Sequence, residues 1–214
     1  MAKITAPFLG LGASGTVAST LTASKWRGRP YVRQRIIPSN PQTAEQSKTR
    51  NTFAWANQVW IRAGSLVIAP WNRFAEGQAL TGRNAWQGQA VKDLRGDADL
   101  TDFTFSIGAK GGLPPTAIVL TPGVGEITVD FTVPVAPTGW TLTSAIAAAI
   151  RDQDPATGTF YTTVEGEDVS NPYQVVLSGL TGSQLYRVGG WLKWTKPDGS
   201  IAYSAAVMDS DTPT

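Results

Sequence analysis

Residues 25–60 read KWRGRPYVRQRIIPSNPQTAEQSKTRNTFAWANQVW, and this stretch decides the fold of the N-terminal half. Its first part alternates two sets of side chains over residues 31–37, and this period of two predicts a strand with one basic face. One set is Tyr31, Arg33, Arg35 and Ile37, and the other is Val32, Gln34 and Ile36. The preceding residues 16–26 are rich in Thr, and residues 27–30 favour a turn, so we expect a β-hairpin. Pro38 ends the second strand, because proline has no N–H to donate to a ladder.

The second part of the stretch predicts a helix over residues 44–63. Thr43 and Gln46 have the spacing of a capping box, in which the Thr hydroxyl accepts from the backbone N–H three residues later. Gly64 suits the end of this helix. The apolar residues at helical spacing predict one buried stripe, and they are Phe53, Ala56, Val59 and Trp60.

Residues 65–76 and 83–94 predict two shorter helices, the second with Thr81 as its cap. Together with residues 1–15, interpreted as a glycine-rich docking arm, the hairpin and the helices are expected to form a mixed α+β domain over residues 1–113. Gly-Gly and Pro-Pro pairs follow, so a linker is expected over residues 110–115, with the domain boundary near Leu113. The expected core is aromatic and consists mainly of Trp55, Trp60, Trp71 and Trp86.

Residues 114–214 are expected to form an all-β immunoglobulin-like sandwich. Short β-prone runs separated by turn residues occupy residues 117–207 and show no helical period. Asp198 and Gly199 predict the turn of the last hairpin, since glycine adopts a positive φ without strain. In the sixth run Trp194 alternates inward and Trp191 outward, so Trp194 is predicted in the core and Trp191 as a candidate exposed contact for a sugar ligand.

The sequence contains neither Cys nor His among its 214 residues. This excludes disulfides, thiol nucleophiles, zinc sites of the usual ligand types and every triad with an imidazole base. Glu165, Glu167 and Asp168 lie close together but match no calcium-loop spacing, so a solvated turn is preferred over a Ca²⁺ site. We therefore expect no enzyme, no cofactor and no metal site.

Membrane insertion and secretion are also disfavoured by the sequence. No apolar run approaches the ~20 residues that cross a bilayer. Residues 1–15 contain one Lys and a very short apolar patch, which makes a poor secretory signal. Synthesis in a cytoplasm and no membrane partner are expected.

Charge divides the chain into two parts. Residues 1–97 carry thirteen Lys or Arg and four Asp or Glu, a net charge of +9, whereas residues 98–214 carry five and twelve, a net charge of −7. Such an asymmetry indicates two parts with different surroundings. The basic residues gather on the predicted hairpin and the first helix.

The predicted hairpin supplies the candidate docking residues, which are Trp26, Arg27, Arg29, Tyr31, Arg33 and Arg35. A basic strand suits docking onto an acidic protein lattice. Two alternatives are a plain solvated surface and a nucleic-acid patch, for which Trp26 and Tyr31 offer stacking. The acidic C-terminal half disfavours nucleic acid.

Leu180-x5-Tyr186-x-Val188 resembles the corner that leads into the sixth strand of a fibronectin type III module. Ile127-x-Val129-x-Phe131 followed by Pro134 is similar to the second strand of that fold, with Phe131 where a Trp is usual. The resemblance covers residues 116–208. It implies an immunoglobulin-like strand arrangement.

Five segments of the N-terminal half carry a second resemblance. They are SGTV (14–17), WRGRPYVR (26–33), NPQTAEQSKTRNTFAWA (40–56), APWNRFAEG (69–77) and LTGRNAW (80–86). In this order they resemble a family of phage and prophage virion-associated proteins. The resemblance implies a virion or virion-assembly protein and no residue-level activity.

These expectations combine into a two-domain bacteriophage virion structural protein, made in the host cytoplasm and located in the virion. The preferred function is a capsid decoration or head-associated protein that docks through its basic N-terminal half and projects its acidic sandwich. It is expected to be oligomeric or lattice-bound, with the major capsid protein as preferred partner and a host-surface glycan as a further candidate. A tail or connector component is the alternative within the class, and a carbohydrate-binding or nucleic-acid-binding module is the alternative from another class.

Overall fold

The computed structural model describes residues 3–4, 13–17, 20–26, 29–37, 42–95 and 97–214. The chain divides into two compact units, Met1–Gln42 and Thr43–Thr214. The division thus falls ahead of the helices, whereas the sequence placed a domain boundary near Leu113. The helices belong with the strands that follow them because the two share one hydrophobic core.

The first unit contains a four-stranded antiparallel sheet in the order β1-β2-β3-β4. The predicted hairpin is confirmed, since β3 and β4 pair from Leu21↔Gln34 to Trp26↔Arg29. Five residues of the predicted arm lie in β1 and β2, and its other residues lie outside the described ones. The strands are β1 (Lys3–Ile4), β2 (Ala13–Val17), β3 (Leu21–Trp26) and β4 (Arg29–Gln34).

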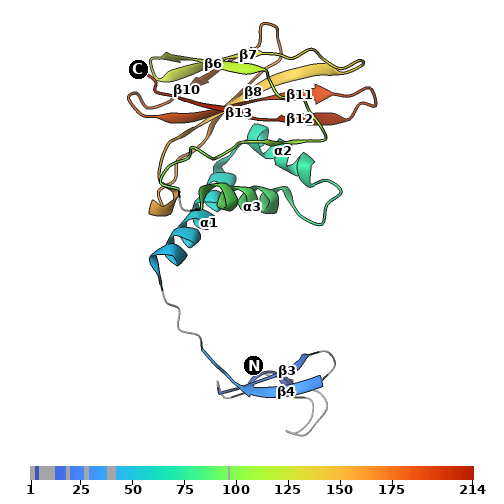
Figure 1. The fold of residues 1–214 in the computed structure, drawn as a ribbon, viewed down its shortest axis with the longest axis vertical. Helices are drawn as coiled ribbons and strands as arrows, with labels where there is room; N and C mark the ends of the chain where they lie inside the picture. Colours follow the sequence, from blue (N-terminus) through green and yellow to red (C-terminus); the bar gives the residue numbers. More distant parts are fainter. Residues whose placement is uncertain (1–2, 5–12, 18–19, 27–28, 38–41, 96) are drawn as a thin grey trace. The chain divides into compact units, whose positions relative to one another are not determined.

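The second unit has three layers (Figure 1). Helices cover one face of a six-stranded sheet in the order β5-β12-β11-β8-β9, in which β13 also pairs with β11, and a three-stranded sheet in the order β10-β7-β6 covers the other face. The helices are α1 (Ala44–Arg62), α2 (Ser65–Ala75), α3 (Gly82–Leu94) and the short 3-10 helix η1 (Pro155–Thr157). The strands are β5 (Ile107–Ala109), β6 (Ala117–Gly123), β7 (Glu126–Thr132), β8 (Thr141–Arg151), β9 (Val164–Asp168), β10 (Gln174–Ser178), β11 (Tyr186–Thr195), β12 (Ile201–Ala205) and β13 (Val207–Asp211). Among the residues described, no helix is long and apolar enough to cross a membrane.

Helix α1 begins at its predicted cap. The Thr43 hydroxyl accepts from the backbone N–H of Gln46 at 3.3 Å and so satisfies one of the donors that lack a partner inside the helix. The buried face differs from the predicted stripe, because Phe53 is 52% exposed whereas Trp55 is fully buried. Trp55 lies on the face that packs on the core, where its ring meets Phe103 edge to face with centroids 5.5 Å apart.

Helix α2 receives its cap from a distant strand. Gly64 precedes the helix and has no side chain to donate or accept. Instead, Oε2 of Glu165 in β9 accepts from the backbone N–H of Val67 at 2.9 Å. A Cβ on Gly64 would lie 1.5 Å from Glu165 Oε1, so the glycine leaves the space that the carboxylate occupies. Gly64 therefore leaves room for the carboxylate that caps α2. It also follows the end of α1, as predicted.

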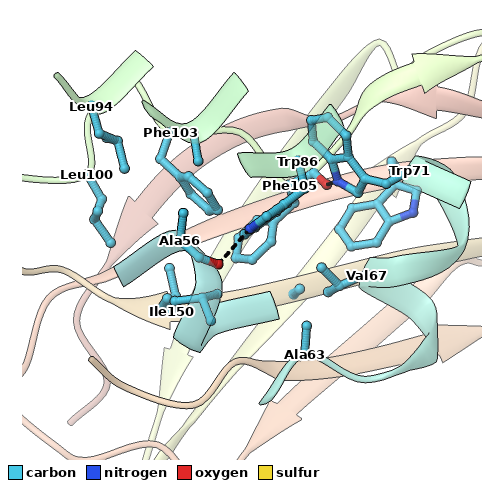
Figure 2. Close-up of a cluster of buried hydrophobic side chains, with 14 of the residues drawn as sticks. Ala56, Ala63, Val67, Trp71, Trp86, Leu94, Leu100, Phe103, Phe105 and Ile150 are labelled. Atoms are coloured by element: carbon cyan, nitrogen blue, oxygen red, sulfur yellow. Dashed lines mark hydrogen bonds between the residues drawn. The ribbon is translucent and has the colours of Figure 1, made fainter. Parts of the chain in front are cut away.

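Tryptophans of the helices lie at the centre of the core beneath the six-stranded sheet (Figure 2). Nε1 of Trp71 donates to the carbonyl of Phe105 at 2.7 Å, and Nε1 of Trp86 donates to the carbonyl of Ala56 at 2.9 Å. The ring centroids of Trp71 and Trp86 are 5.5 Å apart in an edge-to-face arrangement, a favourable geometry for aromatic pairs. The sheet closes this core with Ile146, Ala148, Ile150 and Trp191.

The β-sandwich over the C-terminal half is confirmed by the strand order. Tyr186 forms the predicted corner, since its Oη accepts from the backbone N–H of Thr181 at 2.9 Å and Leu180 is buried beside it. The predicted hairpin turn is present as well, with Gly199 at φ +77° and its N–H donating to the carbonyl of Lys196 at 2.9 Å. One of the β-prone runs within residues 117–207 covers residues 159–166, and there the strand begins only at Val164.

The predicted linker over residues 110–115 is part of the sandwich. Gly112 bridges to Ser204 in the six-stranded sheet, and the carbonyl of Leu113 accepts from Nε1 of Trp194 at 2.8 Å. A Cβ on Gly112 would lie 2.4 Å from the backbone carbon of Tyr203. The glycine that indicated a flexible linker is therefore required for a close approach between two backbones.

Two glycines of β11 allow aromatic rings to pack closely on both faces of this strand. Gly189 faces the helical core, where a Cβ would lie 2.7 Å from the ring of Phe105. Gly190 faces the three-stranded sheet, where a Cβ would lie 2.7 Å from the ring of Phe131. Each aromatic ring thus packs directly on the backbone of the central strand.

Candidate functional site

The β3–β4 hairpin brings three predicted docking residues to one face of the first unit's sheet. Tyr31, Arg33 and Arg35 are two residues apart along an extended segment, so they share a face. The register places Ser24 beside Tyr31 and Thr22 beside Arg33. This face is polar and basic.

The remaining predicted docking residues are only partly described. Trp26 and Arg29 form the last pair of the hairpin register, and their side chains lie outside what the structure describes. Arg27 falls in the turn, also outside the described residues. The structure therefore brings together Tyr31, Arg33 and Arg35 and places the backbones of Trp26 and Arg29 at the end of the same hairpin.

Residues 31–37 are all exposed, on both faces of the strand and beyond its end. The exposed fraction of Val32 is 49%, and Ile36 and Ile37 reach 79% and 74%. Among the described hydrophobic side chains of this unit, Ala23 is the buried one. The described side chains therefore bury little apolar surface, and covering the exposed ones would stabilise the sheet.

Charge in the first unit has one sign. Met1–Gln42 contains six Lys or Arg and no Asp or Glu. The ion pairs between described residues lie in the second unit, and none involves Arg33 or Arg35. The guanidinium groups of β4 and its extension have no acidic neighbour in their own unit.

The prediction that Trp191 is an exposed ligand contact is wrong. Its exposed fraction is 0%, and its ring stacks on Phe105 with centroids 6.1 Å apart. Alternation did place Trp191 opposite Trp194, which is also buried. The outward face of β11 is covered by the helices, and a period of two along one strand carries no information about that cover.

The acidic residues of β9 each have a structural partner. Besides Glu165 at α2, Glu167 lies 3.7 Å from Lys193 Nζ and accepts from the Ser144 hydroxyl. Asp168 accepts from the backbone N–H groups of Gln174 and Ser170, which lower the pKa of its carboxyl. These carboxylates belong to a strand rather than to the predicted solvated turn, and no group of three or more potential metal ligands was found among the described residues.

Arg187 joins β11 to the segment before β5. Its guanidinium donates to the Thr101 hydroxyl at 2.7 Å and lies 3.2 Å from Asp152. The Thr101 hydroxyl and backbone N–H, helped by Arg187, hold the pKa of Asp99 below its usual value. The carboxylates of Asp99 and Asp152 neutralise the charge of Arg187. This network therefore connects two segments of the chain and is not an anion-binding site.

A cleft of about 560 Å³ opens at one end of the sandwich. None of its lining residues is charged, and Trp194 at its base is fully buried. Sequence reasoning missed this cleft because its walls come from four separate segments. The lining includes Phe131, Pro134, Leu142, Asn171, Tyr173 and Trp194.

Comparison of the sequence with known protein families finds no match, and comparison with curated proteins finds none either. Similar solved structures include a redesigned β-sandwich protein, with 18% identity over 47% of this chain and 89% of that chain and a TM-score of 0.35. Another is the fn3 domain of the human collagen alpha-1(XX) chain, with 19% identity over 50% of this chain and 89% of that chain and a TM-score of 0.36. A myokine structure has 12% identity over 49% of this chain and all of that chain, with a TM-score of 0.35.

Proposed function

We propose that this chain is a bacteriophage virion structural protein, a capsid decoration or head-associated protein that docks through the sheet of its first unit. The distribution of charge carries the proposal. Met1–Gln42 has six Lys or Arg and no acidic residue, a net charge of +6, whereas Thr43–Thr214 has twelve basic and sixteen acidic residues, a net charge of −4. The first unit therefore favours an acidic partner such as the outer surface of a particle.

The docking element in this proposal is narrower than the N-terminal half. Each helix buries a tryptophan in the core beneath the six-stranded sheet, namely Trp55 in α1, Trp71 in α2 and Trp86 in α3, so this face of the helices is already covered. In the first unit, the exposed apolar side chains Val32, Ile36 and Ile37 lie in the same segment as the exposed cations Arg33 and Arg35. Covering that apolar surface would contribute roughly 25 cal/mol per Å² to binding, before the cost of association.

A tail or connector position is the alternative within the class, and it would use the same basic sheet. The two positions differ in copy number. Quantitative mass spectrometry of purified particles tests the proposal: a copy number close to that of the major capsid protein supports a decoration protein. A copy number matching a single vertex or the tail supports the alternative, and absence of the chain from particles contradicts both.

The first prediction concerns the basic face. Replacing Arg33 and Arg35 together by Ala should weaken association with particles that lack this chain about 2- to 30-fold, because each exposed ion pair contributes ~0.2–1 kcal/mol. Association should also depend less on salt, since mobile ions screen exposed charges beyond ~10 Å at 0.1 M. Co-sedimentation at two salt concentrations measures both effects.

Lys92→Ala with Arg95→Ala is the matched control, because it removes the same charge from exposed positions of the second unit. The control should bind like the unaltered protein. Equal weakening by both pairs would mean that only net charge matters and would contradict docking through β4. A single-stranded oligonucleotide that binds more tightly than the particle would favour the nucleic-acid alternative.

A further inference from the structure

Strand β4 is an edge strand with one unused side. It lies at the end of the order β1-β2-β3-β4, and within the described part of the chain only β3 pairs with it. Edge strands are protected by charged side chains, prolines, bulges or a covering loop. Of these, β4 and its extension have the charges of Arg33 and Arg35, which repel a basic strand and attract an acidic one. Here Pro30 lies near the start of β4, and residues 31–37 after it are exposed without a proline among them.

The hydrogen bonds of the hairpin show which backbone groups point to the unused side. The N–H of Arg35 donates to the carbonyl of Thr20 at 2.6 Å, which continues the register of the hairpin. Because hydrogen-bonded and non-hydrogen-bonded pairs alternate in an antiparallel ladder, Arg33 and Tyr31 also point toward β3. The N–H and C=O groups of Val32 and Gln34 therefore point away from it, to the free edge.

The charge on this edge selects between possible strands. A second copy of β4 would bring Arg33 and Arg35 against the same cations, and like charges facing each other across a sheet destabilise it. An acidic strand would place carboxylates beside Arg33 and Arg35, for which no ion pair exists among the described residues. The edge thus disfavours self-pairing and favours an acidic partner.

We infer that β4 binds an extended acidic segment of its partner by strand addition, with the free backbone groups of Val32 and Gln34 forming the new ladder. This inference rests on the proposed docking function and adds how the partner is held. Backbone pairing supplies the affinity, and Arg33 and Arg35 supply the preference for carboxylates. The partner segment must then be extended and free of proline at the paired positions.

Amide hydrogen exchange of the full chain provides a direct test. The probe is a synthetic peptide of about eight residues that alternates Glu and Thr, a typical strand length with high β-propensity. Without peptide, the amides of Val32 and Gln34 should exchange faster than those of Tyr31, Arg33 and Arg35. With peptide, protection should rise at Val32 and Gln34, and a uniform change at all five positions would overturn strand addition.

A proline scan supplies the second readout. Val32→Pro removes an N–H that the hairpin does not use, so it should weaken peptide binding about fivefold or more while Tyr31 and Arg33 keep their protection. Val32→Ala is the matched control, because it shortens the same side chain and keeps the N–H. Gln34→Pro repeats the test should Val32→Pro disturb the hairpin. Equal binding by the proline and alanine variants would overturn the inference.

The outcomes also separate this inference from the proposed function. If Arg33→Ala with Arg35→Ala abolishes particle association while Val32→Pro leaves it unchanged, docking stands and strand addition fails. If the peptide protects Val32 and Gln34 while no variant affects particles, strand addition stands and docking on the particle fails. Dimers that protect these two amides without peptide would overturn the acidic partner in favour of a second copy.

Discussion

Glu165 connects two elements that are far apart in sequence, because its carboxylate caps α2 from β9. The sequence predicts a solvated turn for Glu165, Glu167 and Asp168, since the three carboxylates are neighbours and no local pattern marks a distant helix as the partner of any of them. Thr43 and Thr81 could be predicted as caps because each lies three residues before the N–H that it accepts from. A cap that forms a local hydrogen bond can be predicted from sequence spacing, whereas a cap supplied by a distant strand cannot.

The cap of α2 predicts a coupled pair of substitutions. Glu165→Ala should lower the free energy of unfolding by about 0.5–2 kcal/mol, as loss of an N-cap usually does, while Glu165→Gln keeps an acceptor and should cost less. Gly64→Ala should displace the same carboxylate, because its Cβ would overlap Glu165 Oε1. Urea denaturation of the single variants and the double variant should therefore show losses that do not add. Additive losses would contradict the proposed contact.

Strand β11 shows what the sequence reveals at the scale of an element. Its position could be predicted from short-range alternation, and Tyr186 and Leu180 form the expected corner. The environment of its outward face could not be predicted in this way. Residues before 107 form the helices that cover this face, and alternation within one strand does not reveal them. Trp191 is buried for this reason. Its Nε1 has no hydrogen-bond partner among the described residues, and the packing of its ring on Phe105 must offset the cost of burying that donor.

The glycine pair in β11 predicts a cost of adding even one methyl group. Gly190→Ala should lower the free energy of unfolding by about 1–3 kcal/mol, because its Cβ would meet the rings and branched side chains packed on the strand, namely Phe131 and Ile118. Gly88→Ala is the control: Gly88 lies inside α3 with nothing within 4 Å of its Cβ position. That change should stabilise the protein by about 0.5–1 kcal/mol. Similar effects from both substitutions would contradict the packing of β11.

At the scale of the whole molecule, the helices and the sandwich form one folding unit. The core beneath the six-stranded sheet mixes Trp55, Trp71 and Trp86 with Ile146, Ile150 and Trp191. Gly and Pro pairs in a sequence indicate a linker only where the chain is free, and Gly112 instead passes close to Tyr203. Charge divides the sequence near residue 97, but this boundary runs between the layers of one compact unit.

This architecture predicts how the chain can be cut. A fragment of residues 43–214 should unfold in one cooperative thermal transition, because it keeps both cores. A fragment of residues 114–214 should show no such transition, since it loses β5 and exposes Trp191, Ile146 and Ile150. Calorimetry of the two fragments at equal concentration measures the difference. Cooperative unfolding of the shorter fragment would show that the sandwich does not need its helical cover.

The division after Gln42 has a consequence for genetic exchange. Recombination between related genes preserves folding when the crossover leaves each core intact, so a crossover near codon 113 would separate Trp191 from the helices that cover it. A crossover between codons 42 and 43 falls at the division between the two compact units. Under the proposed function, a chain of this kind could acquire a new particle specificity by replacing its first 42 residues. The sandwich and its helices would be inherited together.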